Sequence, residues 1–269
     1  MTESPSICDT TADQQFQLAV REQYPESYEF ESRYVEHEMA HVGHLFATGV
    51  CPVEGQEVLE FGCNIGATSI VLSHNGARVT AVDVSPSCLE TARLNAKRYG
   101  IDGIRFQLVH EGQRLPFADA AFDVVICNSV LEYVRPELLP CVQRELNRVL
   151  KPDGLLLVWG TSNRLSPVEA HSGEWFNNYI PRRFDPPSGR RRERGVSPWR
   201  LRHGFGPGYK DLFSGWTGTR HYLKLKQMMG LNPAKLRLLH SLGTVFAISP
   251  ISLPLVMPYA AVLLQKDAE

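Results

Sequence analysis

One stretch decides the fold of this 269-residue chain: Val58-Leu59-Glu60-Phe61-Gly62-Cys63-Asn64-Ile65-Gly66-Ala67. An apolar strand carrying one acid leads into a turn with two glycines and then into a helix. Gly62 and Gly66 permit backbone dihedrals closed to other residues and let the main chain approach a ligand. Asn64 stands between them, and asparagine tolerates a left-handed conformation. The stretch therefore predicts a strand–turn–helix unit that contacts a ligand.

Short β-branched runs alternate with helical stretches from Glu57 to about Gly160. We predict parallel βαβ units in one open sheet, an α/β doubly wound fold with right-handed crossovers. Ligands on such sheets bind at the carboxyl ends of the strands. The predicted strands are 57–61, 78–82, 104–108, 122–127 and 154–158, and the predicted helices start at 67 and cover 89–99 and 136–150.

The chain divides by composition. Residues 1–13 are polar, and we expect them to be disordered. Residues 14–50 are predicted to form a helical cover over a core formed by residues 51–160. Residues 161–242 are expected to form an inserted lid, with helices near 219–229 and 233–242, and residues 243–269 to add C-terminal strands that complete the sheet.

Composition limits the function and the compartment. The hydrophobic share of 43% and charged share of 21% are ordinary for a globular protein. A net charge of -1 argues against a protein whose main task is to neutralise nucleic-acid phosphates. The six cysteines show no metal-ligand spacing, which favours a reducing compartment. The N-terminus lacks a signal peptide pattern, so we expect a cytoplasmic protein. The oligomeric state stays open.

The charges around the glycine turn favour one cofactor chemistry. Asp83 follows Gly62 by 21 residues, at the end of the second predicted strand, where a carboxylate can accept hydrogen bonds from both ribose hydroxyls. A nicotinamide fingerprint would place glycines near 62, 64 and 67, whereas the chain has Asn64 and Ala67. Glu60 would repel a pyrophosphate but suits an ammonium group, so a ligand with an α-amino group and a sulfonium fits better.

These motifs resemble the class I S-adenosylmethionine-dependent methyltransferases, in particular the small-molecule group that includes ubiquinone- and menaquinone-biosynthesis enzymes. The resemblance covers residues 56–160. It rests on four motifs in order: Glu60–Gly66, Asp83-Val84-Ser85-Pro86, a central block (115–117, 121–125 and 131–134), and Arg148–Gly154. It implies a Rossmann-like, mostly parallel sheet of seven strands and S-adenosyl-L-methionine as cofactor, released as S-adenosyl-L-homocysteine.

The resemblance also implies a set of cofactor-binding residues. Glu60, Gly62 and Gly66 would hold the methionine end, and Asp83 the ribose. The full implied set is Glu60, Gly62, Cys63, Asn64, Gly66, Asp83, Val84, Ser85, Glu111, Gly112, Asn128 and Ser129.

Two positions depart from the family's pattern. Glu111-Gly112 occupies the adenine-facing position, where an aspartate is more usual, while Asn128 and Ser129 would line the pocket floor. Tyr133 replaces a histidine common there, which puts in doubt any acceptor chemistry that relies on that histidine.

The candidate base lies just after the fifth predicted strand, in a segment that arrives over the strand ends. His171 titrates near neutral pH and has Glu169 two residues away, so we predict these two as the catalytic residues. The alternative is a loop histidine that is hydrogen-bonded for structure.

Eight arginines lie within residues 182–202, interleaved with aromatic residues. They could grip a phosphate, a carboxylate or RNA, or form a solvated loop. We therefore expect a small acceptor that is anionic or lipophilic. A nucleic-acid acceptor is the less favoured alternative.

His37-Glu38-Met39-Ala40-His41 matches the HExxH pattern of zinc proteases. Both histidines share one helix face, but no third ligand follows at the extended spacing. The segment also precedes the cofactor core, where the family places a helix over the pocket. We therefore predict no metal site.

The chain carries no charge from Ser241 to Gln265, which is long enough to span a membrane. Pro250, Pro254 and Pro258 oppose a helical span, because each interior proline costs a helix about 3 kcal/mol. We predict a pair of buried strands joined by a proline-rich turn. A rim that contacts lipids or a lipophilic acceptor, and thus peripheral membrane contact, is the alternative.

The sequence thus predicts methyl transfer to a small molecule, first to an oxygen of a natural product, quinone-like, sugar-like or lipid-like compound. Three alternatives stay open: a non-catalytic S-adenosylmethionine-binding scaffold, an RNA methyltransferase that uses the arginine-rich segment, and a nicotinamide oxidoreductase. The acceptor and the methylated atom are not identified.

Overall fold

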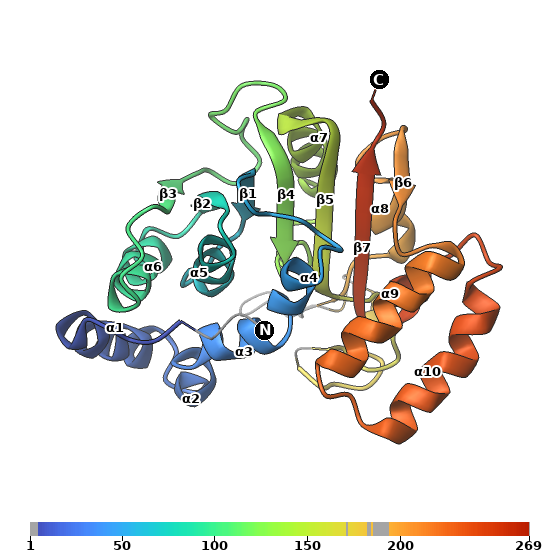
Figure 1. The fold of residues 1–269 in the computed structure, drawn as a ribbon, viewed down its shortest axis with the longest axis horizontal. Coiled ribbons are helices and arrows are strands. Elements are labelled where there is room, and N and C mark those ends of the chain that lie inside the picture. Colours follow the sequence, from blue (N-terminus) through green and yellow to red (C-terminus); the bar gives the residue numbers. More distant parts are fainter. Residues whose placement is uncertain (1–4, 171, 182–183, 185–193, 269) are drawn as a thin grey trace.

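A seven-stranded sheet forms the centre of the protein, which a computed structural model describes at residues 5–170, 172–181, 184 and 194–268. The strand order is β3-β2-β1-β4-β5-β7-β6 (Figure 1). The first five strands run parallel, and β7 is antiparallel to both β5 and β6. The strands are β1 (Glu57–Phe61), β2 (Arg78–Asp83), β3 (Arg105–Leu108), β4 (Phe122–Asn128), β5 (Leu150–Ser162), β6 (Tyr209–Asp211) and β7 (Tyr259–Lys266). The predicted doubly wound sheet is confirmed.

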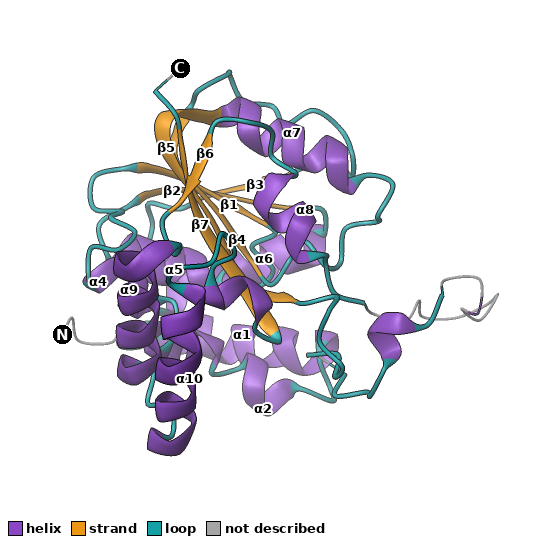
Figure 2. Cartoon of the chain, turned by 90° about the vertical axis from the view of Figure 1, so that its right-hand side faces the viewer, coloured by secondary structure: helices purple, strands orange, loops and turns teal. Residues whose placement is uncertain are grey.

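Helices cover both faces of this sheet, as the edge-on view in Figure 2 shows. They are α1 (Thr10–Gln23), α2 (Tyr28–Glu31), α3 (Tyr34–Ala40), α4 (Gly43–Ala47), α5 (Ala67–His74), α6 (Pro86–Arg98), α7 (Leu139–Val149), α8 (Pro198–His203), α9 (Gly215–Met228) and α10 (Pro233–Phe246), with 3-10 helices at Asn177–Tyr179 (η1) and Leu253–Val256 (η3).

The central strands are apolar on both sides because both sides are covered. Val58 of β1 packs into the cluster that includes α5, α6 and α9, while its neighbour Leu59 packs into the cluster with α7 and α8. The chain winds from β1 toward β2 on one side and later returns to place β4 on the other. The turn after β1 therefore lies at the switch point, where sheets of this kind bind ligands.

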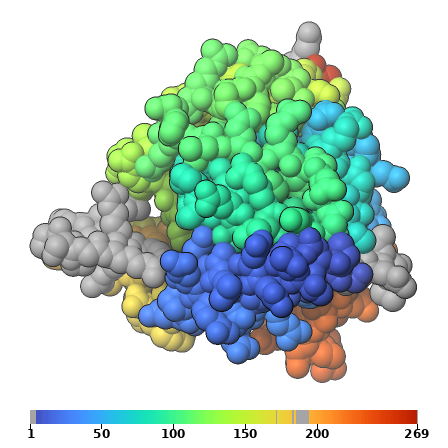
Figure 3. Space-filling model, turned by 90° about the vertical axis from the view of Figure 1, so that its left-hand side faces the viewer, coloured from blue at the N-terminus to red at the C-terminus, as the bar shows by residue number. Residues whose placement is uncertain are grey.

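Helices α1 to α4 form a layer against the core, seen in blue in Figure 3. The expectation that residues 1–13 are disordered is wrong for residues 10–13, because α1 begins at Thr10; residues 1–4 lie outside the described residues. Asp9 caps this helix by accepting a hydrogen bond from the Ala12 amide at 2.9 Å. The side chains of Phe16 and Val20 lie on the apolar face of this helix and are fully buried.

Arg98 joins this layer to the core. Its side chain is 1% exposed and lies over the Phe16 ring, with the guanidinium carbon 3.8 Å from the ring centroid. Its Nη1 donates to Asp13 at 2.9 Å, and its Nη2 donates to the Ser32 carbonyl at 3.2 Å. Arg98 of α6 therefore binds α1 through Asp13 and the segment between α2 and α3 through Ser32.

The C-terminal part differs from the prediction of two buried strands. Only β7 is a strand there, and α10 extends to Phe246 because Asn232 caps it and its apolar residues recur at helical spacing. The prolines fall after the helix, with Pro254 in η3 and Pro258 before β7. The three-residue strand β6, inside the predicted lid, was not predicted. No helix among the described residues is long and apolar enough to cross a membrane.

Replacing Arg98 with methionine should lower the free energy of unfolding by about 3 kcal/mol, because a buried ion pair loses one partner. Urea denaturation followed by circular dichroism measures this. Arg93→Met, on the exposed side of α6, is the matched control and should cost less than about 1 kcal/mol. Equal losses in the two variants would show that Arg98 does not hold the cover.

Candidate active site

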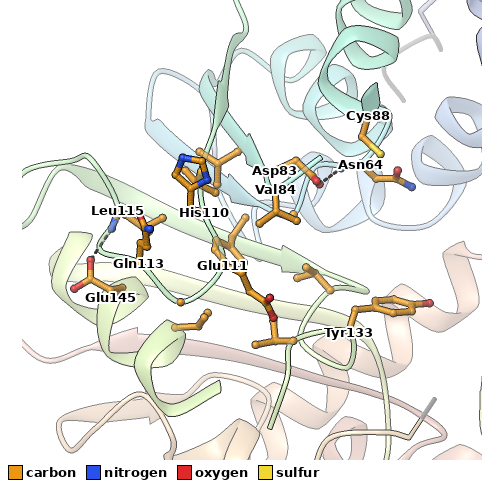
Figure 4. A pocket seen from close by; sticks show the side chains of 18 of the residues that line it. Asn64, Asp83, Val84, Cys88, His110, Glu111, Gln113, Leu115, Tyr133 and Glu145 are labelled. Carbon is orange, nitrogen blue, oxygen red and sulfur yellow. Dashed lines mark hydrogen bonds between the residues drawn. The ribbon is translucent and has the colours of Figure 1, made fainter. Parts of the chain in front are cut away.

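The first of two adjoining cavities lies at the carboxyl ends of β1, β2 and β4 and has a volume of about 290 Å³. Figure 4 shows Asp83 hydrogen-bonded to Asn64 at one end and Glu145 hydrogen-bonded to Leu115 at the other. The lining residues that argue most for a nucleoside ligand are Gly62, Asp83, Val84, Glu111, Gly112 and Leu115.

The glycine turn shapes one wall of this first cavity. Gly62 and Asn64 both have left-handed backbones, with φ of 78° and 48°. A Cβ on Gly62 would lie 2.1 Å from Cγ2 of Val130, so a side chain would collide with the opposite wall. The turn therefore needs glycine here for space as well as for conformation.

Asp83 is held in place by two main-chain amides. The Asn64 amide donates to its Oδ2 and the Ser85 amide to its Oδ1, each at 2.9 Å. Each oxygen keeps a further lone pair, and Asp83 lines the cavity. A fixed carboxylate of this kind can accept both hydroxyls of a ribose.

The second cavity is larger, about 890 Å³, and lies between the N-terminal helices and the sheet edge. Asn64, Ser129 and Tyr133 line both cavities, so the two spaces share a wall. Six aromatic side chains line this cavity, together with two histidines, Lys226 and three glutamates (Glu26, Glu31 and Glu38). The aromatic residues are Tyr24, Phe30, Tyr34, Tyr133, Trp159 and Tyr259.

Two buried carboxyl groups lie at this junction. Glu38 of α3 accepts a hydrogen bond from Nδ2 of Asn128 at 2.8 Å and lines the second cavity. Glu60 of β1 lies behind it and accepts a hydrogen bond from the Ser69 hydroxyl. Burial raises the pKa of Glu38 to about 7, and burial together with the Glu38 charge raises the pKa of Glu60 to about 8. The pair forms a buried acidic site that an ammonium group would satisfy.

The structure brings together most of the predicted cofactor residues. Gly62, Asn64, Asp83, Val84, Glu111, Gly112 and Ser129 line the first cavity, and Asn128 lines the second.

Four other members of the predicted set line neither cavity. Glu60 is buried behind Glu38, and Cys63 is buried beside the turn. Gly66 packs so closely that a Cβ would lie 2.9 Å from Cβ of Ala92, and Ser85 caps α6 by accepting from the Cys88 amide. These four residues pack behind the residues that line the cavities and hold them in place.

The predicted catalytic pair is not assembled by the described residues. His171 lies outside them. Glu169 is fully buried, accepts hydrogen bonds from the Ser162 hydroxyl at 2.6 Å and the Ser172 amide at 2.7 Å, and lines neither cavity. Its carboxylate therefore fixes the loop after β5.

The arginine-rich segment is described only in part. Arg194 is buried and donates from Nε to the Ile180 carbonyl at 3.0 Å. Arg202 donates from Nη1 to the Tyr209 carbonyl at 3.3 Å. Arg182, Arg183, Arg190, Arg191 and Arg192 lie outside the described residues.

Sequence reasoning missed Glu38 and the two histidines beside it as site residues. The HExxH pattern marked them, but for zinc. In the structure the rings of His37 and His41 are stacked 4.0 Å apart, and Glu38 is turned to Asn128. Within the described ranges, no group of three or more His, Cys, Asp and Glu side chains could hold a metal ion. The motif therefore contributes to the cavity wall.

Comparison with known proteins identifies the core. A methyltransferase domain family matches residues 59–158. A ubiquinone biosynthesis O-methyltransferase of Paracidovorax citrulli is 33% identical over 43% of this chain and 48% of its own length. Another, from Maricaulis maris, is 32% identical over 52% of this chain and 54% of its own length. The chain thus spans about half the length of these relatives.

The fold is shared more widely. The YcgJ protein of Bacillus subtilis superposes with a TM-score of 0.50 over 84% of this chain and 97% of its own, at 22% identity, which shows the fold alone. The match over residues 59–158 confirms the predicted class I S-adenosylmethionine-dependent methyltransferase domain in that part of the chain. S-adenosylmethionine is its cofactor, and the residues fit it: Asp83 for the ribose, the buried acids for the ammonium, and a turn with no room for a Cβ.

The buried acids should make the ligand-free protein less stable as pH rises. Each folded-state pKa is raised above the ordinary value of 4.5, so their contribution is complete below that value and is lost as pH rises through about 7 to 8. The free energy of unfolding should fall between about pH 4.5 and about pH 8, by at most roughly 1.4 kcal/mol per pH unit for each proton.

Glu60→Gln should flatten this dependence, because the amide can still accept from Ser69 but does not titrate. Urea denaturation at several pH values measures the slope. Glu90→Gln, on the exposed side of α6, is the control and should keep the wild-type slope. An unchanged slope in Glu60→Gln would contradict the protonated buried acid.

Proposed function

We propose that this protein transfers the methyl group of S-adenosylmethionine to an oxygen of a small, flat, hydroxylated acceptor held in the second cavity. The observation that carries the proposal is the wall of Asn64, Ser129 and Tyr133 shared by the two cavities. A donor whose nucleoside occupies the first cavity can present its reactive end at this wall. The names of the two ubiquinone biosynthesis relatives favour an oxygen acceptor.

Positioning is the main contribution of the residues around the shared wall. Methyl transfer breaks a carbon–sulfur bond and forms a carbon–oxygen bond in line, so the two partners must meet in one orientation. The Tyr24 hydroxyl donates to Oδ1 of Asn64 at 2.6 Å, which ties the N-terminal cover to the wall. Fixing donor and acceptor in this way can remove up to roughly 7–11 kcal/mol of the barrier.

The aromatic lining supports a ring-shaped acceptor. Phe30 and Tyr34 face the second cavity from the N-terminal helices, while Trp159 and Tyr259 line it from β5 and β7. Aromatic pairs prefer stacked or edge-to-face contacts, each worth about 0.5–1.5 kcal/mol beyond the burial of area. Such walls hold a flat ring while leaving its hydroxyl free to face the donor.

A hydroxyl acceptor also needs a group that takes its proton. His171 stays a prediction, since it lies outside the described residues. Among the described residues we assign this role to His41, which lines the second cavity. Its Nδ1 lies 2.7 Å from the carbonyl oxygen of His37. A carbonyl can only accept, so Nδ1 carries the hydrogen and Nε2 carries the lone pair that can take a proton.

The end of α3 explains why this tautomer is fixed. The His41 amide donates to the Glu38 carbonyl, which leaves the His37 carbonyl without its usual helical partner. The imidazole of His41 supplies the missing donor. His37 suits the role less, because burial and the charge of His41 lower its pKa to about 4.

The acceptor class can be tested with donor labelled in its transferable methyl group. Offered a catechol, a hexose and a short RNA, the protein should label the catechol. Phe30→Ala should raise the catechol KM about tenfold through lost ring contact. The affinity for S-adenosylhomocysteine should stay within about twofold, because Phe30 lines only the second cavity. Phe176→Ala, whose ring is similarly exposed and lines neither cavity, is the matched control.

Label that enters RNA alone would support the RNA alternative and contradict this proposal. Donor binding without transfer to any acceptor would favour the non-catalytic scaffold.

His41→Gln should lower kcat by about 100-fold or more, the usual loss for a general base. Donor affinity should change much less. His44→Gln, a neighbouring histidine that lines neither cavity, should keep the wild-type kcat. If His41→Gln also keeps the wild-type kcat, another group takes the proton.

A further inference from the structure

Helix α10 exposes a stripe of large apolar side chains. Leu238 is 62% exposed, Leu242 37% and Val245 61%, and Ile248 just beyond the helix is 78% exposed. The first three follow one another at i, i+4 and i+7 and therefore lie on one face. Gly243 is the one α10 residue that is fully buried. Figure 1 shows α10 at the edge of the molecule, packed beside α9 and away from the sheet.

The charges around this stripe have a single sign. Between Leu212 and Lys266 the chain has no Asp or Glu and carries six Lys and Arg residues, although the whole protein has a net charge of -1. Two of the six have contacts inside the protein: Lys226 lies over the Trp159 ring, and Lys266 donates to the carbonyls of Asn147 and Leu150.

The other four cations are exposed on the two helices. They are Arg220 and Lys224 on α9 and Lys235 and Arg237 on α10. At 100° per residue, Lys235 and Arg237 lie on opposite sides of the stripe of Leu238, Leu242 and Val245. An apolar stripe between cations, on a helix with no acids, has the pattern of a helix that lies in a membrane interface.

We propose that the α9–α10 face docks on an anionic phospholipid surface, with the stripe in the interface and the cations against the headgroups. An acid-free segment of 55 residues complements a surface that is negative throughout. A second copy fits this face poorly, because a twofold interface would set the same cations against each other. The proposal requires nothing about the acceptor.

The docked face has a structural link to the second cavity. Lys226 of α9 lines that cavity, and α9 packs against α10. Docking would therefore bring a helix that contributes to the cavity wall to the bilayer interface.

Vesicle co-sedimentation of the full chain tests the proposal. The protein should bind vesicles of phosphatidylglycerol and phosphatidylcholine, release at high salt, and ignore vesicles of phosphatidylcholine alone. Lys235→Gln with Arg237→Gln should lower the partition coefficient about thirty-fold, at roughly a factor of five for each cation. Leu238→Gln with Val245→Gln should lower it by at least about tenfold.

Leu18→Gln is the matched control, since Leu18 is 68% exposed on α1, far from α10 in the chain. All variants should keep wild-type affinity for S-adenosylhomocysteine, which shows that they are folded whether or not an acceptor is known. Binding that the α10 substitutions leave unchanged would overturn the proposal. So would equal binding to neutral vesicles, or a concentration-dependent dimer broken by the Leu238 and Val245 substitutions without any vesicle binding.

Discussion

The tight turn between β1 and α5 is the constraint on which the site depends. Gly62 lies against Val130 and Gly66 against Ala92, so the turn is closed on both sides by neighbouring elements. Its left-handed backbone directs the Asn64 amide at Asp83 and thereby joins the ends of β1 and β2. The first cavity, the position of α5 and the orientation of Asp83 all follow from this one turn.

The two buried acids, Glu38 and Glu60, form part of the candidate binding site at a cost to the stability of the folded protein. Glu38 and Glu60 come from elements that the chain brings together only in the folded state, and burial holds both pKa values near or above neutrality. A burial of this kind costs stability when no cation is present. The hydrogen bonds from Asn128 and Ser69 offset part of that cost and keep each carboxyl oriented.

The parts of the fold that are local in the sequence could be predicted from it. The strand, the turn and the acid of the donor site lie within a short βαβ unit, where spacing fixes geometry, and Asn64 takes the left-handed backbone expected of it. Glu38 could not be placed in this way, since its contact with Asn128 joins residues 90 positions apart. Helix α10 was predicted over 233–242 and extends four residues further, whereas β6 was missed because its three residues are too short a stretch to indicate a strand, and pairing with β7 defines it.

The position of β7 has a consequence for how the sheet is completed. This strand lies between β5 and β6, although both precede it in the chain. During synthesis β6 therefore has no strand to pair with, and β5 keeps an open edge, until β7 has emerged. An unpaired edge of this length is a template for pairing with other chains. Until β7 pairs with β5 and β6, the sheet therefore lacks the strand that closes the edge of β5.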